Sequence, residues 1–410
     1  MDERISFGMN AGCTIVSPNY LHYARTLSES YRQHHPDHLF FVLVVAKVTD
    51  SSLFEGEPFT AVLLNEIGLE NIPALAMKYD ILELNTNVKP TFLKHLLDKH
   101  RQLDHVVYLD PDIFVYAPLN PIFTLLLDNN IVITPHTVIP QIHGSLEREQ
   151  GTLLCGTYNL GFIGLKRGAE SAMFLDWWER RCLQLAYSEL QSGLFVDQKW
   201  INLVPGLFDG VAICRHLGCN MAYWNLQERT LAPHENSYMV NGKYLLIFYH
   251  FSGIVIDAPN SLTKYTEEYT FETRRDLREI FYSYREAVTN NRREATDNIP
   301  YGFDHFNNGV KVRSLTRRIF SAHEARFPLD NPFSESSSFY QFAKKKRLIG
   351  GREFAGQKIW RTANQNSTSI RILNFTFRIA LFVLGPAYYE MLMRYISHFS
   401  NLRAQKVFLK

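Results

Sequence analysis

The stretch Val106–Asp112 (VVYLDPD) constrains the fold of this 410-residue chain more than any other. Its apolar half predicts a buried strand, and this strand ends in two carboxylates, Asp110 and Asp112. Residues two positions apart on an extended backbone point to the same side, so these carboxylates can share one cation. Oxygen ligands suit Mg²⁺ or Mn²⁺. The alternative is a strand-end turn whose acids are only solvated.

Hydrophobic patterns around this stretch predict an α/β protein. Residues 10–16 and 39–45 have the composition of strands, and residues 21–31 between them carry apolar side chains at helical spacing. A strand, a helix and a second strand within about 35 residues form a βαβ unit, which implies a parallel sheet. Open sheets of this kind bind ligands beyond the carboxyl ends of their strands. Further strands are predicted at residues 131–134, 158–165, 220–225 and 244–251.

Charge is distributed unevenly along the chain. The formal net charge is +2, but residues 301–410 contain 18 Lys+Arg and 6 Asp+Glu, a net charge of +12. The first 300 residues contain the other 25 Lys+Arg and 35 Asp+Glu, a net charge of −10. An acidic body with a basic tail indicates an anionic partner for the tail. Because the tail lacks a nucleic-acid-binding motif, we do not expect nucleic acid to be that partner.

The cysteines and the N-terminal residues predict a cytoplasmic location. The chain has five cysteines, an odd number, and no pair has the spacing of a metal site, which favours free thiols in a reducing compartment. Residues 1–12 carry acids where a secretory signal needs a basic start and an apolar core. We expect no membrane span, because no uninterrupted apolar run in the sequence reaches the necessary length.

Four sequence blocks occur in an order that is similar to nucleotide-sugar glycosyltransferases of the GT-A fold. They are Asn19-Tyr20 after the first predicted strand, YLDPD (108–112), the pair NLGF (159–162) and VDQKWIN (196–202), and YHFSG (249–253). Over residues 8–260 the chain resembles the group that contains glycogenin and the bacterial lipopolysaccharide galactosyltransferases. This resemblance predicts a GT-A domain over residues 1–265, Rossmann-like with a mostly parallel central sheet flanked by helices. A helical, basic C-terminal extension is predicted over residues 266–410.

The resemblance implies a metal site and a set of donor contacts. Asp110, Asp112 and His250 would be the ligands of Mn²⁺ or Mg²⁺, which offsets charge on the leaving diphosphate of the nucleotide sugar. Asp197 and Gln198 would face the transferred sugar as catalytic residues. From the residues alone, Asp197 could instead be a helix cap and His250 a structural histidine. Contacts to the nucleotide sugar are implied for Cys13, Thr14, Ile15, Tyr20, Thr86, Lys89, Leu109, Asp110, Asn159, Gly161 and Gly253.

The implied reaction is transfer of a hexose from a nucleoside diphosphate sugar, with UDP as the expected nucleotide, to a glycan or lipid-linked acceptor. Retention at the anomeric carbon and a place in polysaccharide biosynthesis are implied as well. Ser17 and Lys199 stand where the family usually carries acids. One alternative is a metal-dependent nucleotidyltransferase or phosphohydrolase, since paired carboxylates serve phosphoryl transfer too. Another is a protein that binds nucleotide sugars without catalysis.

The basic tail also contains a long aromatic and aliphatic segment. Residues 375–384 and 388–396 are mostly apolar, Gly385-Pro386 separates them, and arginines are interspersed. This composition suits a segment that lies in a membrane interface, which would place the protein peripherally on the inner face of the membrane. The alternative is that the segment packs on the catalytic domain.

Overall fold

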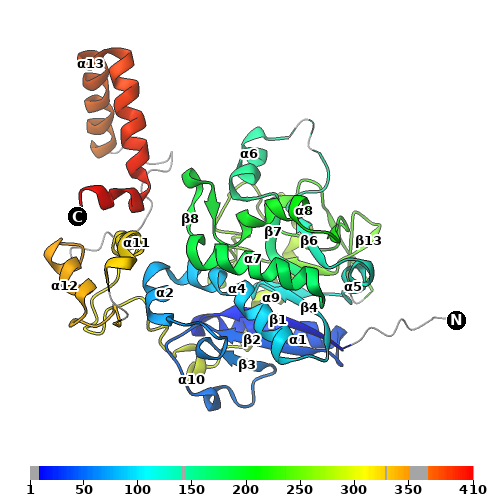
Figure 1. The fold of residues 1–410 in the computed structure, drawn as a ribbon. Helices are drawn as coiled ribbons and strands as arrows, with labels where there is room; N and C mark the ends of the chain where they lie inside the picture. Colours follow the sequence, from blue (N-terminus) through cyan, green and yellow to red (C-terminus); the bar gives the residue numbers. More distant parts are fainter. Residues whose placement is uncertain are drawn as a thin grey trace. The chain divides into compact units, whose positions relative to one another are not determined.

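The computed structural model describes residues 9–140, 142, 144–235, 237–327, 330–350 and 368–409. They form two compact units (Figure 1): residues 9–75 with 81–303, and residues 76–80 with 304–409. Residues 266–303, which the sequence assigned to the extension, belong to the first unit. The reason is that α9 (Arg278–Asn290) packs against α1 (Leu21–His34), and Arg25 of α1 pairs with Asp297 at 2.9 Å.

A seven-stranded sheet forms the centre of the first unit, with the strand order β10-β6-β7-β4-β1-β2-β3. Strand β7 runs antiparallel to both of its neighbours, and the other pairings are parallel. The predicted mostly parallel sheet of a GT-A-like α/β fold is therefore confirmed. Its strands are β1 (Met9–Val16), β2 (Leu39–Val44), β3 (Thr60–Leu63), β4 (Leu103–Leu109), β6 (Ile131–Pro135), β7 (Tyr158–Lys166) and β10 (Val211–Ile213).

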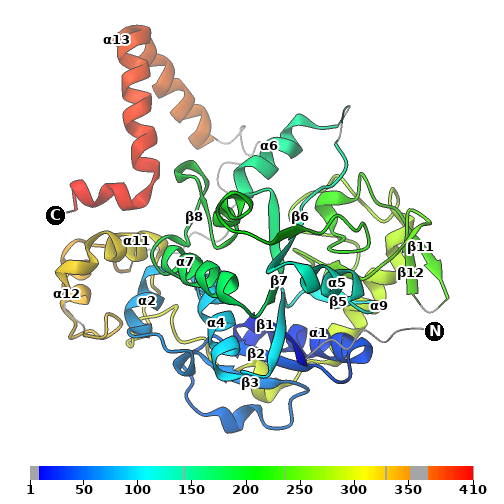
Figure 2. The ribbon, with the colours of Figure 1, turned by 45° about the vertical axis from the view of Figure 1, so that its right-hand side comes forward.

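Helices cover both faces of this sheet, with α1 and α5 on one side and α4 and α7 on the other (Figure 2). The α-helices after α1 are α2 (Ile72–Lys78), α3 (Ile81–Asn87), α4 (Lys89–Lys99), α5 (Asn120–Asp128), α6 (Leu146–Cys155), α7 (Ala169–Leu185), α8 (Val204–Leu207) and α10 (Glu294–Asp297). Short 3-10 helices are η1 (Pro18–Tyr20), η2 (Ser51–Phe54), η3 (Leu64–Glu66), η4 (Leu190–Ser192), η5 (Gln198–Leu203), η6 (Tyr223–Asn225) and η7 (Arg275–Leu277).

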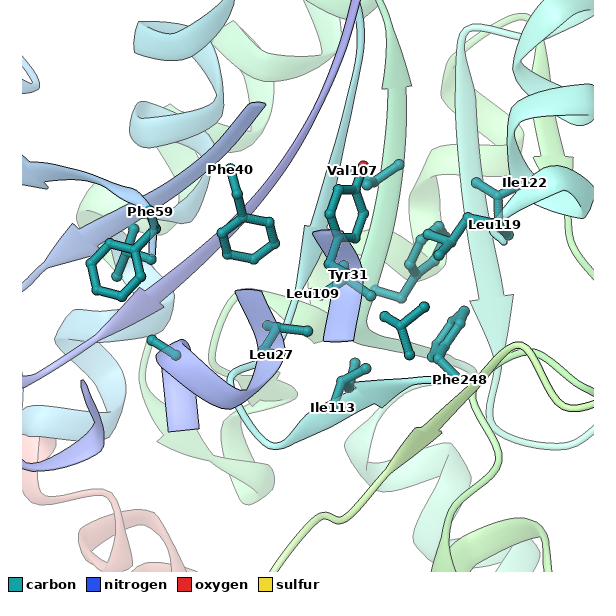
Figure 3. Packing of buried hydrophobic residues seen from close by; sticks show 14 of the residues in the cluster. Leu27, Tyr31, Phe40, Phe59, Val107, Leu109, Ile113, Leu119, Ile122 and Phe248 are labelled. Carbon is teal, nitrogen blue, oxygen red and sulfur yellow. The ribbon is translucent and has the colours of Figure 1, made fainter. Parts of the chain in front are cut away.

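The side chains of β4 alternate between the two faces of the sheet. Val107 and Leu109 are fully buried among residues of α1 and α5, such as Tyr31 and Ile122 (Figure 3). Tyr108 points to the opposite face, toward α4. Burying each large apolar side chain stabilises the fold by about 1.5–3 kcal/mol. The carboxyl end of β4, which Asp110 directly follows, is thus held by packed side chains on both faces of the sheet.

A second strand pair continues directly from this point. Strand β5 (Ile113–Val115) pairs antiparallel with β14 (Phe248–His250). The predicted strand at 244–251 is therefore divided, because its first part, β13 (Tyr244–Leu245), joins β11 (Leu231–His234) and β12 (Ser237–Val240) in a separate sheet. The remaining pair is β8 (Ser188–Glu189) with β9 (Leu194–Phe195).

The predicted strand at residues 220–225 is wrong. Asn220 has a positive φ of 56°, and the segment continues into η6. The Asn225 amide accepts from the backbone N–H of Ala222 at 2.9 Å and donates to the carbonyl of Asn220 at 3.0 Å. These local side-chain bonds replace a strand ladder, which is the usual effect of asparagine in turns.

The second unit is helical, which confirms the predicted character of the extension. Its helices are α11 (Ser314–His323), η8 (Glu324–Arg326), α12 (Ser338–Lys345), α13 (Thr368–Ser400) and η10 (Leu402–Val407). Arg317 of α11 donates to the carbonyls of Ala76 and Tyr79 at 2.6 and 2.8 Å, which joins residues 76–80 to this unit. After α13 the chain returns to α11, against which η10 packs.

Candidate metal centre

Asp110, Asp112 and His250 converge at the carboxyl edge of the central sheet. One ligand atom from each lies within 4.8 Å of the others. His250 Nε2 is 3.0 Å from Asp112 Oδ1 and 3.7 Å from Asp110 Oδ2. His250 is almost fully buried, whereas the side chains of Asp110 and Asp112 are 31% and 21% exposed. The carboxylates thus face the solvent side of the group, where a ligand can enter.

Strand pairing explains how residues far apart in the sequence meet here. His250 lies opposite Ile113 in the β5–β14 pair, next to Asp112. The N–H of Phe251 donates to the Asp112 carbonyl at 2.8 Å, and the N–H of Asp110 donates to the Gly161 carbonyl at 2.8 Å. The group is therefore fixed by backbone hydrogen bonds from β7 and β14.

The orientation of His250 is set by a chain of buried amides. Nδ1 of His250 lies 3.3 Å from Asn220 Oδ1. The amide nitrogen of Asn220 donates to Thr134 Oγ1 at 2.9 Å and to Asn159 Oδ1 at 3.1 Å. Because both Asn220 donors are in use, its oxygen accepts from Nδ1–H of the imidazole. The Nε2 lone pair then faces the carboxylates, which is the orientation that a metal-binding histidine needs.

Gly161 is a glycine because His250 lies against it. A Cβ atom at this position would lie 2.3 Å from Cε1 and 2.7 Å from Nδ1 of His250, and 2.8 Å from Asn159 Oδ1. The sequence predicted close approach of a ligand to the backbone here. The structure shows close approach of the His250 side chain to it.

We expect Gly161→Ala to weaken Mn²⁺ binding by at least about 10-fold, because the imidazole must move out of the group. Titration with Mn²⁺, followed by the electron paramagnetic resonance signal of the free ion, measures this. Gly151→Ala in α6 is the control, since a Cβ there meets no atom within 4 Å. Equal Mn²⁺ affinity of the two variants would contradict the assignment of His250 as a ligand.

Lys89 forms a buried ion pair beside the metal group. Its Nζ lies 2.7 Å from Asp197 Oδ2, donates to the Leu160 carbonyl at 2.8 Å and lies 3.9 Å from Asp110 Oδ1. It also lies 4.2 Å from the ring centre of Tyr108. An ammonium group has three N–H donors, so one remains for Asp110 or a ligand. Lys89 is therefore not a solvated surface lysine, and its predicted contact with the nucleotide sugar stays a prediction.

The charges of the site favour a divalent cation. Asp110, Asp112 and Asp197 carry three negative charges, and Lys89 carries one positive charge, so the site with neutral His250 has a net charge of −2. Burial lowers the pKa of His250, but Asp112 and Asp110 outweigh burial and raise that pKa above its ordinary value. A proton thus partly offsets the carboxylates when no cation does. Carboxylate oxygens with one imidazole suit Mn²⁺ better than Mg²⁺.

Asp197 directly precedes η5 but does not cap this helix with its side chain. Its side chain makes no capping hydrogen bond to η5, which excludes the capping alternative. The indole N–H of Trp178 donates to the Asp197 carbonyl at 3.1 Å. Burial raises the pKa of the Asp197 carboxyl, and the Lys89 ammonium opposes that rise.

Gln198 connects the backbones of two neighbouring elements. Its side-chain oxygen accepts from the N–H of Leu160 at 3.0 Å, and its amide nitrogen donates to the Cys155 carbonyl at 3.0 Å. Both ends of the amide are therefore engaged with the backbone of β7 and the end of α6. Gln198 fixes the strand that carries Gly161.

Several predicted donor contacts lie at the carboxyl end of β1. The side chains of Cys13, Thr14 and Ile15 are buried, and burial raises the pKa of the Cys13 thiol. Pairing of β1 with β4 ends at Cys13, whereas pairing with β2 continues through Val16. The backbone edge of Thr14 and Ile15 that faces β4 is therefore not covered by strand pairing. Any contact of these residues with a nucleotide would be made by that edge.

Two other predicted contacts are used inside the fold. The Thr86 hydroxyl donates to the carbonyls of Leu82 and Glu83 at 3.0 and 3.1 Å within α3. The Leu109 side chain is fully buried in the core, so only its backbone is adjacent to the site. Among the described residues, no hydrogen bond joins Thr86 to the metal group.

Two tyrosines, Tyr20 and Tyr265, lie near Asp112. Tyr20 is 40% exposed and stacks on Tyr23 with ring centres 4.9 Å apart. Burial, and then the negative charge of Asp112, raise the pKa of both Tyr20 and Tyr265. Gly253 has a φ of +73°, and a Cβ there would lie 2.5 Å from the Tyr265 ring. Gly253 thus allows Tyr265 to lie beside the chain that leaves His250.

Three residues of the site were missed from the sequence. Tyr108 donates its hydroxyl to Asp110 Oδ1 at 2.7 Å. Asn220 orients His250. Tyr265 lies close enough to Asp112 for this negative charge to add to the effect of burial in raising the Tyr265 pKa. Only Tyr108 carried a signal, because it lies two positions before Asp110 on the same strand face. Asn220 and Tyr265 are brought in by tertiary contacts that no local pattern predicts.

The fold and the site define an α/β protein of the GT-A class with a candidate divalent-metal group at its sheet edge. No protein-family model matches the chain. The chain belongs to the family of the uncharacterized protein YfnF of Bacillus subtilis (strain 168), to which it is 31% identical over 285 residues, covering 68% of this chain and 91% of YfnF. It is also 24% identical to the uncharacterized protein YfnD of the same organism over 251 residues, covering 59% of this chain and 77% of YfnD.

Solved glycosyltransferase structures are also similar to this chain, at lower sequence identity. The galactosyltransferase LgtC, solved with donor and acceptor sugar analogs, is 15% identical, with 68% of this chain and 95% of LgtC covered and a TM-score of 0.41. The glycosyltransferase GlyE of Streptococcus pneumoniae TIGR4 is 14% identical, with 69% of this chain and 63% of GlyE covered and a TM-score of 0.40. Likenesses this distant transfer no substrate or mechanism to the chain.

Proposed function

We propose that this protein is a metal-dependent glycosyltransferase that moves a hexose from a nucleoside diphosphate sugar, with UDP as the expected nucleotide, to a glycan or lipid-linked acceptor. The observation that carries the proposal is the group Asp110, Asp112 and His250, at the edge where α/β sheets bind ligands. With Asp197 and Lys89 included, the site has a net charge of −2, which favours a bound cation, and a cation held there would in turn hold a diphosphate.

The residues of the site have separate roles in this proposal. A divalent cation bound by Asp110, Asp112 and His250 would supply charge neutralisation for the leaving diphosphate. Asn220 keeps the imidazole in the ligating orientation. The open edge of Thr14 and Ile15 and the exposed ring of Tyr20 would meet the nucleotide.

The sugar-facing role falls to Asp197 and its neighbours. Its buried carboxylate would stabilise positive charge that develops at the anomeric carbon, since such charges act strongly where water is excluded. Lys89 Nζ, 2.7 Å from Asp197 Oδ2, favours the ionised form of this carboxylate. Gln198, with both amide ends engaged, would position the β7 backbone next to the sugar. These roles suit retention, which needs no dedicated base.

A panel of nucleotide sugars, screened with and without Mn²⁺, tests the proposal. We expect one donor to stabilise the full chain thermally only with Mn²⁺, by about 2.7 kcal/mol at 100 times its dissociation constant. Slow release of nucleoside diphosphate should accompany it. Release of pyrophosphate or inorganic phosphate would instead identify a phosphoryl-transfer enzyme. Mn²⁺-dependent binding without turnover of any donor would identify a non-catalytic binding protein.

A further inference from the structure

Helix α13 is a hairpin of two helical arms (Figure 2). Gly385 has a φ of 70° and a ψ of 167°, which interrupts the helix, and Pro386 begins the second arm. Glycine at a positive φ followed by proline is the usual way to end one helix and begin another. By length and composition the stretch Ile370–Ser400 could cross a membrane, which corrects the expectation of no candidate span. The interspersed arginines had divided it into short apolar runs.

The hairpin exposes apolar side chains on all sides. None of its most apolar stretch is buried against the described residues. Around the break, Phe382 is 90% exposed and Val383 is 71% exposed. A helix that is apolar all round is normally buried in a core or in a membrane.

Charge is absent from the tip and gathers toward the open end. Residues 379–389 contain no charged side chain. At 1.5 Å per residue, Arg378 and Arg394 lie about 10 and 14 Å from the break along their arms. The acid in the hairpin, Glu390, pairs with Arg394 at 2.5 Å. Arg371, Arg403 and Lys406 lie still nearer the open end, so residues 368–409 have five basic groups against one acid.

We propose that the tip of this hairpin, residues 379–389, inserts into one leaflet of an anionic lipid bilayer. Interfacial helices bury their apolar faces about 5–10 Å deep, which places Arg378 and Arg394 at the level of the phosphates. Each arm is shorter than the roughly 20 residues that span a bilayer, and the break turns the chain back. Both arms therefore enter from one side.

The distribution of charge favours a bilayer over a second copy of this chain as the occupant. Two copies meeting through their hairpins would bring like-charged arginines together, which is unfavourable. An anionic surface pairs with the same arginines while the tip enters the acyl chains. The inference goes beyond the proposed transferase activity and is tested without any nucleotide sugar.

Sedimentation of the full chain with vesicles of phosphatidylglycerol and phosphatidylcholine at low salt tests the proposal. We expect the chain to pellet with these vesicles, and the double variant Phe382→Glu/Val383→Glu to lose at least about 10-fold in partitioning. Leu146→Glu/Leu153→Glu in α6 is the matched control, because these side chains are similarly exposed, at 80% and 70%. It should pellet like the parent chain.

Three further variants test the electrostatic contribution of the arginines to vesicle binding. Each of Arg371→Gln, Arg378→Gln and Arg394→Gln should lower partitioning onto anionic vesicles by about 5-fold, and should have little effect with phosphatidylcholine alone. Absence of pelleting by the parent chain, or equal pelleting of the parent and the tip variant, would overturn the proposal. A parent dimer that the tip variant converts to monomer, without vesicle binding, would assign the tip to a second copy of the chain.

Discussion

Asp112→Asn should remove Mn²⁺ binding and, with it, Mn²⁺-dependent binding of UDP. The change takes away one of two ligating carboxylates and reduces the net charge of the site from −2 to −1. It also removes the charged partner of His250, 3.0 Å from Nε2. Loss of a residue that only supports a ligand typically costs 10–100-fold in metal affinity, so we expect a loss of more than about 100-fold here. Mn²⁺ titration by electron paramagnetic resonance and calorimetry with UDP measure the two affinities.

Asp98→Asn is the matched control, because it makes the same chemical change on an exposed part of α4. Its Mn²⁺ affinity should equal that of the parent. Circular dichroism should show intact secondary structure in both variants, since Asp112 lies in a connection and its backbone contacts survive. Unchanged Mn²⁺ affinity of Asp112→Asn would remove the basis of the proposed function.

The sheet could be predicted from the sequence because its strands are buried on both faces. Continuous apolar runs such as 39–45 and 106–109 leave few other structures, and the helix between 21 and 31 implies parallel pairing. The strand predicted at residues 220–225 was wrong, because this segment is not a continuous apolar run. Its apolar residues suggested a strand, but the side chains of Asn220 and Asn225 provide local hydrogen-bond partners that a strand ladder would have to replace.

The sequence could predict which residues belong to the candidate site, but not which of them contact one another. Asp110 and Asp112 follow from strand geometry, but the place of His250 depends on the register of β14 against β5. Lys89 was expected to contact the nucleotide sugar, and the structure pairs it with Asp197. Gly161 was expected beside a ligand, and His250 lies against it. Such pairings arise from tertiary packing, which composition and periodicity do not contain.

Asp197→Asn should lower turnover by a factor of about 10² to 10³ while lowering Mn²⁺ and UDP affinity far less than Asp112→Asn does. The carboxylate is expected to act on charge that develops in the transition state, and loss of one such contact has this size. Asparagine keeps the shape of the side chain and can still accept from Lys89. Initial rates with the donor found in the nucleotide-sugar screen, compared with UDP binding by calorimetry, separate the two effects.

A purely structural role of Asp197 makes a different prediction, because breaking a buried ion pair by itself destabilises a protein by about 3–5 kcal/mol. Glu57→Gln is the control for that effect. Glu57 pairs with Arg25 at 2.7 Å, and both side chains are almost fully buried. This control should lower the melting temperature and leave turnover per folded molecule unchanged. If Asp197→Asn behaves in the same way, Asp197 only balances Lys89, and the charge that stabilises the sugar must come from another group.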